Sequence, residues 1–155
     1  MATASDSQNQ AWIAYLAFQF PSADRFTVGL LSLDKQGFPV DFRFSSPVQP
    51  TAMQKALYGA TLESWLIQSI AKDLFKDMAH KPQLVITNYK EITSEWLGLP
   101  LYLLERGNTV SDLVLVDPLG KKEEELLSVV SQFTIDLQEP FKRIEQALAL
   151  IPPSR

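Results

Sequence analysis

The sequence predicts a mixed α/β domain, and three features of the chain carry that prediction. Three apolar, strand-like segments come first and are joined by short turns, as in an antiparallel meander. A long helix-compatible stretch follows over residues 51–79. Short apolar segments then alternate with helical ones, and helices close the chain. The expected product is one sheet of mixed strand direction with helices packed on it.

The composition is that of one globular domain. The chain has 155 residues, enough to bury a core, and its 46% of hydrophobic residues excludes an intrinsically disordered protein. Residues 1–10 are small and polar, and we expect them to form a disordered lead-in. Residues 11–152 are expected to form a single domain, because no linker divides them.

The first strand is predicted over residues 12–20. Both alternating sets of its side chains are largely apolar, which is the pattern of an interior strand covered on both faces. A turn at residues 21–25 leads to a second strand over residues 26–33.

A four-residue turn that ends at Gly37 connects the second strand to a third over residues 38–44. A type I turn followed by a left-handed glycine is a common hairpin connection. In the third strand Asp41 and Arg43 alternate with apolar residues. We therefore expect an edge strand with one buried face, and an exposed ion pair on the other.

The stretch 51–79 is the longest helical segment of the sequence. Thr51 is the predicted N-cap, and Gly59 is expected to divide the stretch into a short helix and a longer one. Apolar residues cover most of its circumference, which predicts packing on more than one side. Either its own chain covers this surface, or Tyr58 and Trp65 form part of an interface with a partner.

The second half of the chain alternates strands and helices. Pro100 is expected at the start of its strand, and Asp136 and Glu139 have the spacing of a capping box. Whether the segment 113–116 joins the sheet is left open. The predicted order is strand 83–87, helix 90–97, strand 99–104, strand 113–116, helix 121–133 and helix 137–151.

This order of elements resembles that of the ribonuclease-H-like superfold over most of residues 11–105. The resemblance implies a two-metal site with one acidic residue in the first strand and another at the end of the fourth. Here the first strand contains no Asp or Glu, and the fourth ends in Thr87-Asn88. A neutral amide cannot offset the charge of two cations. The usual metal site is therefore missing, which argues against a catalytic nuclease.

Other catalytic chemistry finds little support. His80 is the single histidine, and its place at the end of a helix favours a capping role. The chain has no cysteine and no glycine-rich phosphate loop, nucleophile elbow or metal-binding motif. We therefore predict no catalytic residue, no metal and no cofactor.

Four polar residues are the candidates for a ligand-binding pocket. Ligands in α/β sheets gather beyond the carboxyl ends of parallel strands, and these residues are expected just past such ends. The same residue types also favour helix caps and loops for backbone reasons alone, so both interpretations stay open. The candidates are Asn88, Tyr89, Arg106 and Asp117.

Net charge and hydropathy limit the partners. A net charge of -4 disfavours bulk attraction to nucleic acid or to an anionic membrane surface. The longest N-terminal apolar run is too short to cross a bilayer, and the absence of cysteine suits a reducing compartment. We expect a soluble, cytoplasmic protein.

The sequence therefore favours a non-catalytic domain that binds another protein or itself. The absence of a catalytic constellation, the abundance of aromatic residues and the broadly apolar helix support this expectation. The alternative is an enzyme, a divergent metal-dependent nuclease or phosphoryl-transfer protein with an atypical site at the strand ends.

Overall fold

The computed structural model describes residues 11–22, 25–45, 49–76, 78, 81–90, 92, 98–133 and 136–150 of the chain. Its strands are β1 (Ile13–Ser22), β2 (Arg25–Leu33), β3 (Pro39–Phe44), β4 (Leu84–Thr87), β5 (Leu101–Leu103) and β6 (Val114–Asp117). Its helices are α2 (Ala52–Tyr58), α3 (Leu62–Lys76), α4 (Glu123–Ser131) and α5 (Glu139–Ala149). Two short 3-10 helices, η1 (Gly59–Thr61) and η2 (Val110–Asp112), complete the described elements.

The six strands form one mixed sheet in the order β3-β2-β1-β4-β5-β6. β2 pairs antiparallel with β1 and β3, whereas β4 runs parallel to both β1 and β5. Together with the long helical stretch after the meander and the C-terminal helices, this confirms the predicted α/β class and the ribonuclease-H-like order.

The turn between β2 and β3 is the one that the sequence predicts. Gly37 has a φ of 85°, and its N–H donates to the carbonyl of Asp34 at 3.0 Å. The carboxylate of Asp34 accepts from the N–H groups of Gln36 and Phe38 at 2.9 Å each. The turn between β1 and β2 is shorter than expected, because the strands continue to Ser22 and resume at Arg25.

The strands of the second half of the chain also lie largely where the sequence predicts them. All four residues of β4 are buried, as its continuous apolar run predicts. Pro100 precedes β5, and its carbonyl accepts from the N–H of Val85 at 2.9 Å. The segment left open by the sequence does join the sheet, since β6 pairs antiparallel with β5. The helix predicted over residues 90–97 falls mostly on residues 91 and 93–97, outside the described part of the chain.

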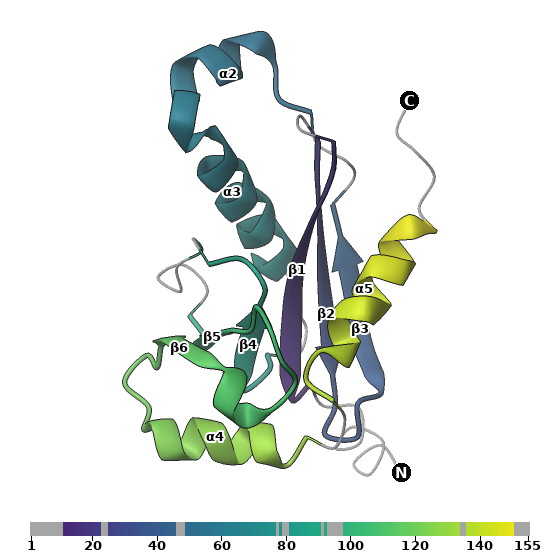
Figure 1. Ribbon diagram of the computed structural model, residues 1–155, viewed down its shortest axis with the longest axis vertical. Helices are drawn as coiled ribbons and strands as arrows, with labels where there is room; N and C mark the ends of the chain where they lie inside the picture. The colour runs from purple at the N-terminus through teal and green to yellow at the C-terminus, as the bar shows by residue number, and fades with distance from the viewer. Residues whose placement is uncertain are drawn as a thin grey trace.

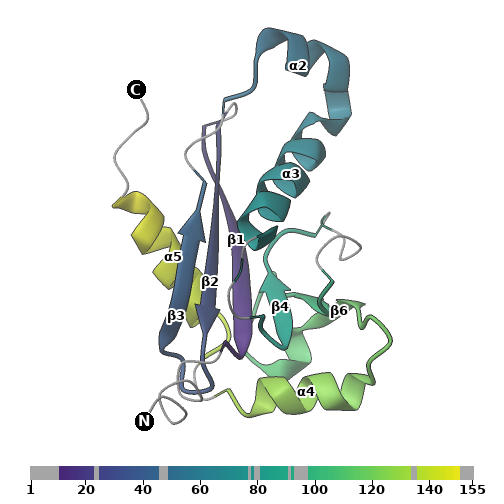
Figure 2. The ribbon, with the colours of Figure 1, turned by 180° about the vertical axis from the view of Figure 1, so that it is seen from behind.

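Two apolar clusters cover the two faces of the sheet (Figures 1 and 2). On one face, α3 contributes Ile67 and Ala71 to a cluster with residues of β1, β2, β4 and β5. On the other, α4 and α5 contribute Leu126, Val130, Phe141, Ile144 and Leu148. The fold is thus three layers with the sheet in the middle.

The burial predicted for β3 is only partly right. Phe42 packs against the cluster under α5, but Phe44 is 44% exposed. Asp41 and Arg43 form the predicted ion pair, with 2.9 Å between Oδ2 and Nε. Their face is not simply open to water, because Nη1 of Arg43 lies 3.5 Å from the carbonyl of Leu74 in α3.

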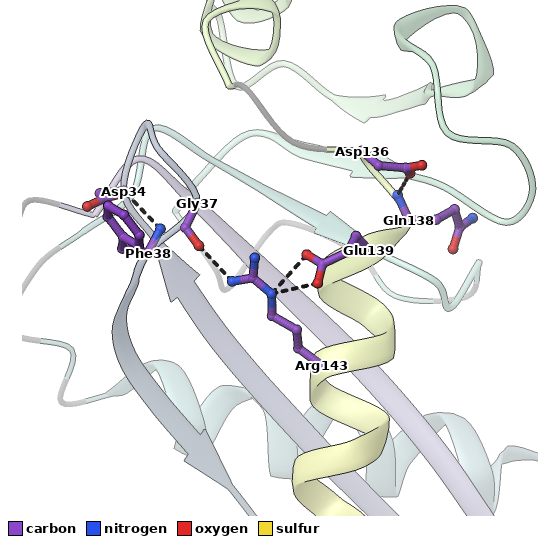
Figure 3. A network of polar contacts seen from close by, with 7 residues as sticks. All are labelled: Asp34, Gly37, Phe38, Asp136, Gln138, Glu139 and Arg143. Carbon is purple, nitrogen blue, oxygen red and sulfur yellow. Dashed lines mark hydrogen bonds and ion pairs between the residues drawn. The ribbon is translucent and has the colours of Figure 1, made fainter.

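The capping box predicted at the start of α5 is wrong. The carboxylate of Asp136 accepts from the N–H of Gln138 at 2.9 Å, one turn before the helix proper. Glu139 instead contacts Arg143, whose Nε lies 2.9 and 2.8 Å from its two carboxylate oxygens. Nη1 of Arg143 also donates to the carbonyl of Gly37 at 2.6 Å (Figure 3). This network ties α5 to the turn between β2 and β3.

Candidate functional site

The segment that joins the meander to the parallel half begins with a well-capped helix. The hydroxyl of Thr51 accepts from the N–H of Gln54 at 3.1 Å, and the side chain of Gln54 accepts from the N–H of Thr51 at 2.9 Å. This capping box confirms the predicted N-cap. Gly59, with a φ of 50°, ends α2 and starts η1, so the predicted division at this glycine is also confirmed.

Helix α2 has no buried residue, so for this part of the stretch the chain itself does not cover the apolar surface that the sequence predicts. Met53 is 66% exposed and Leu57 is 75% exposed, although the helical spacing placed both on the apolar line of the stretch. Both views show α2 beyond the end of the sheet, next to the start of α3 and away from α4 and α5 (Figures 1 and 2). Buried side chains begin in the second turn of α3, with Leu66, Ile67 and Ala71.

We call residues 52–69, which comprise α2, η1 and the first turns of α3, the apolar arm. Lys55 and Glu63 are its two charged residues, so the arm has no net charge. An exposed helical segment of a monomeric protein normally carries a charged face. Exposed apolar side chains with so few charges are instead typical of a surface that another molecule covers.

Two aromatic side chains meet at the bend of the arm. The rings of Tyr58 and Trp65 are stacked, with 4.1 Å between their centroids and 15° between their planes. Beside them lies a hollow of about 350 Å³. Polar side chains complete its wall, and its lining is Tyr58, Thr61, Ser64, Trp65, Gln68 and Ser69. The two residues predicted to contact a partner thus stack on each other and line an open hollow, which leaves their partner a prediction.

The residues at the end of β4 hold the sheet together. The hydroxyl of Thr87 donates to the carbonyl of Leu16 at 2.9 Å, and Oδ1 of Asn88 accepts from the N–H of Phe18 at 3.3 Å. Both bonds join β4 to β1. The position at which the resemblance implies an acidic metal ligand therefore carries polar groups engaged in strand pairing.

Tyr89 connects the end of β4 to the arm. Its ring lies 5.1 Å from that of Phe18. Its hydroxyl donates to a carboxylate oxygen of Glu63 in α3 at 3.3 Å. Tyr89 thus belongs to the packing between the sheet and the base of the arm.

Arg106 lies in a different place from Asn88 and Tyr89. It lines a hollow of about 460 Å³ past the end of β5. The other lining residues are Leu103, Glu105, Ser111, Asp112 and Val114. The hydroxyl and backbone N–H of Thr109 donate to Asp112, and they hold the pKa of its carboxyl below the usual range. Neither Asn88 nor Tyr89 lines this hollow.

Asp117 does not lie at the edge that the sequence predicts. β6 runs antiparallel to β5, and Asp117 is opposite Leu101, the first residue of β5. It therefore lies beside the start of β5, whereas Arg106 follows the end of β5. The expectation that all four polar candidates lie beyond the carboxyl ends of parallel strands is wrong for Asp117, because it assumed that the last strand is parallel.

Two tyrosine hydroxyls are buried on the α5 side of the sheet. Tyr15 of β1 and Tyr102 of β5 are fully buried, and their hydroxyls have no hydrogen-bond partner within the described residues. Burial, reinforced by the nearby charges of Asp136 and Glu139, raises the pKa of Tyr15 far above its ordinary value. Burial also raises the pKa of Tyr102. These groups stay neutral at physiological pH and belong to the core.

No metal-binding cluster occurs in the described ranges, where no three His, Asp or Glu side chains converge. The one histidine, His80, lies outside the described residues, so its predicted capping role stays a prediction. None of the described helices is both long and apolar enough to cross a bilayer.

No protein-family model matches the chain, and no curated protein matches its sequence. The fold and the geometry of its surface are therefore the basis for any functional conclusion.

Sequence reasoning overlooked the exposure of Met53 and Leu57. A usable signal was present, because residues 52–69 contain only one cation and one anion. A helix that is covered by its own sheet on one side usually carries several charged residues toward solvent, and this segment has two.

Proposed function

We propose that the chain is a non-catalytic, cytoplasmic protein-binding domain that binds its partner through the apolar arm. The observation that carries this proposal is that α2 has no buried residue while Met53 and Leu57 are mostly exposed. Burying a leucine side chain contributes about 1.5–3 kcal/mol relative to leaving it in water. A partner that covers this face would gain that contribution, whereas the isolated chain does not.

The chemistry of the arm fits a protein partner. Met, Tyr and Trp are enriched in protein interfaces, and all three occur in the arm, where Tyr58 and Trp65 line the hollow and Met53 is exposed. A phosphate backbone would call for a cluster of cations, but Lys55 is the single cation of the arm. The absence of cysteine in the chain agrees with a reducing compartment.

Site-specific photocrosslinking in the cells that produce the protein tests this function. A benzophenone amino acid at Leu57 should give discrete protein adducts, and the same group at Leu150 serves as the control. Leu150 is a matched position, because it is a similarly exposed leucine that lies outside the arm. Adducts at Leu57 that disappear in Met53→Glu support the proposal. Equal labelling at Leu57 and Leu150, or no adduct at Leu57, would overturn it.

A further inference from the structure

The hollow at the bend of the apolar arm is lined by hydrogen-bond donors that the chain leaves unused. Among the residues that the structure describes, the hydroxyl of Tyr58, Nε1 of Trp65 and the hydroxyl of Ser69 have no hydrogen-bond partner. Ser64 accepts from Nε2 of Gln68 at 2.9 Å, which leaves its own hydroxyl proton free to donate. These four side chains line the same hollow, and each can donate to a ligand.

The residues that line the hollow carry no charge. Two of them are aromatic and four are neutral and polar. A phosphate or a carboxylate is bound by cations, and an ammonium or guanidinium group by anions. The hollow therefore fits a neutral ligand that supplies hydrogen-bond acceptors.

The aromatic part of the hollow is ordered before any ligand binds. Tyr58 and Trp65 are stacked, with 4.1 Å between their ring centroids. The hydroxyl of Thr61 donates to the carbonyl of Tyr58 at 2.6 Å and fixes the bend on which the rings lie. Side chains that are already held in one arrangement lose little conformational entropy on binding. The hollow thus combines a rigid aromatic wall with free donors.

Because the proposed partner is a protein, the recurring modes of peptide recognition narrow the ligand further. Strand addition needs a free sheet edge, but the lining comes from α2, η1 and α3. An amphipathic helix needs a mainly apolar groove, but most of the lining is polar. A polyproline II segment needs aromatic side chains for its rings and donors for its carbonyls, which make no hydrogen bonds within the segment. The hollow supplies both.

We propose that the partner of the apolar arm presents an uncharged, proline-rich segment in the polyproline II conformation, and that this segment docks in the hollow. The inference rests on the proposed function and names the chemistry of the partner. From Thr61 to Ser69 the lining extends over about 12 Å of helix, at 1.5 Å per residue. Polyproline II rises about 3.1 Å per residue, so about four residues of the segment would lie along the hollow.

An NMR titration of the ¹⁵N-labelled full chain with a blocked oligoproline peptide tests this docking. The indole N–H signal of Trp65 should shift as the peptide is added. That of Trp12 should stay, because Nε1 of Trp12 already donates to the carbonyl of Val129 at 2.8 Å. A small interface predicts a dissociation constant between about 1 µM and 1 mM. An unshifted Trp65 signal at about 5 mM peptide, or an equal shift with a blocked Gly-Ser peptide of the same length, would overturn the proposal.

Two substitutions test the donors directly. Trp65→Phe keeps an aromatic ring but removes Nε1, and Ser69→Ala removes a hydroxyl. Each should weaken the binding of oligoproline roughly threefold to tenfold in isothermal titration calorimetry, because one neutral hydrogen bond is lost. Ser131→Ala is the matched control and should bind as the wild type does, since Ser131 is an exposed serine of α4. If both Trp65→Phe and Ser69→Ala bind oligoproline as tightly as the wild type, the docking is wrong.

A neutral oligosaccharide also offers acceptors and an apolar face, so maltohexaose is titrated in parallel. A shift of the Trp65 signal with maltohexaose and none with oligoproline would replace the proposed segment by a sugar. If oligoproline does not bind while Leu57 still gives protein adducts in the crosslinking experiment, the proposed function stands and the polyproline ligand is wrong. Failure of both experiments removes the proposed function as well.

Discussion

Helices α5 and α2 both carry apolar side chains at helical spacing, but only those of α5 are buried within the chain. α5 buries Phe141, Ile144 and Leu148 against β1 and β2. α2 buries nothing and leaves Met53 and Leu57 exposed. The comparison shows that helical spacing of apolar residues indicates a face that gains stability when it is buried. The spacing does not indicate whether the same chain or another molecule buries it.

The difference has a local cause in the sheet. Gly29 of β2 leaves room for α5, since a Cβ there would lie 2.5 Å from Cγ2 of Ile144. Arg143 adds the bond from α5 to the carbonyl of Gly37. Helix α2 has no comparable packing surface among the described residues, and it lies past the strand ends (Figure 1).

The strongest test of this contrast truncates one apolar residue in each region. Ile144 is 1% exposed, and Ile144→Ala should lower the free energy of unfolding by about 2–5 kcal/mol because it leaves a cavity. Leu57→Ala should change it by less than about 0.5 kcal/mol. Urea denaturation at a concentration where the chain is monomeric measures both. A loss at Leu57 as large as that at Ile144 would show that the arm is covered within its own chain.

A smaller effect is expected when the approach of α5 is obstructed. Gly29→Ala should destabilise the protein by about 1–3 kcal/mol, because its Cβ displaces Ile144 and with it the helix. Combining it with Ile144→Ala removes the obstructing methyl. The double variant should therefore be more stable than the sum of the two single changes predicts. In a double-mutant cycle, we expect this difference to be about 0.5–3 kcal/mol. Strict additivity in urea denaturation would contradict direct contact at this point.

The sequence predicted those parts of the fold that depend on local chemistry. Turn geometry at Gly37, the N-cap at Thr51 and the break at Gly59 each follow from the conformational preferences of one or two residues. Buried strands such as β4 follow from a continuous apolar run. These signals were sufficient to obtain the element order and hence the fold class.

The parts that the sequence did not predict depend on long-range pairing. Asp117 was misplaced because nothing near it in the chain states that β6 runs antiparallel. The capping box at Asp136 failed because Arg143, itself fixed by distant Gly37, takes the carboxylate of Glu139. The exposure of Met53 and Leu57 depends on where the sheet ends, which the helical periodicity of α2 does not record.

The smallest expected effect concerns Tyr15, which lies under α5 and has no counterpart in the arm. Its pKa is raised in the folded state by burial, so at alkaline pH the unfolded chain releases this proton before the folded chain does. Stability is unaffected below about pH 10, the ordinary tyrosine value, and falls above it by up to ~1.4 kcal/mol per pH unit. Tyr15→Phe should remove this part of the alkaline loss, as followed by urea denaturation between pH 8 and 11. At pH 8 the variant should be as stable as the wild type or slightly more so, because the hydroxyl has no described hydrogen-bond partner. If the free energy of unfolding falls at alkaline pH as steeply in Tyr15→Phe as in the wild type, water reaches this hydroxyl. In that case α5 covers the sheet less tightly than its buried side chains indicate.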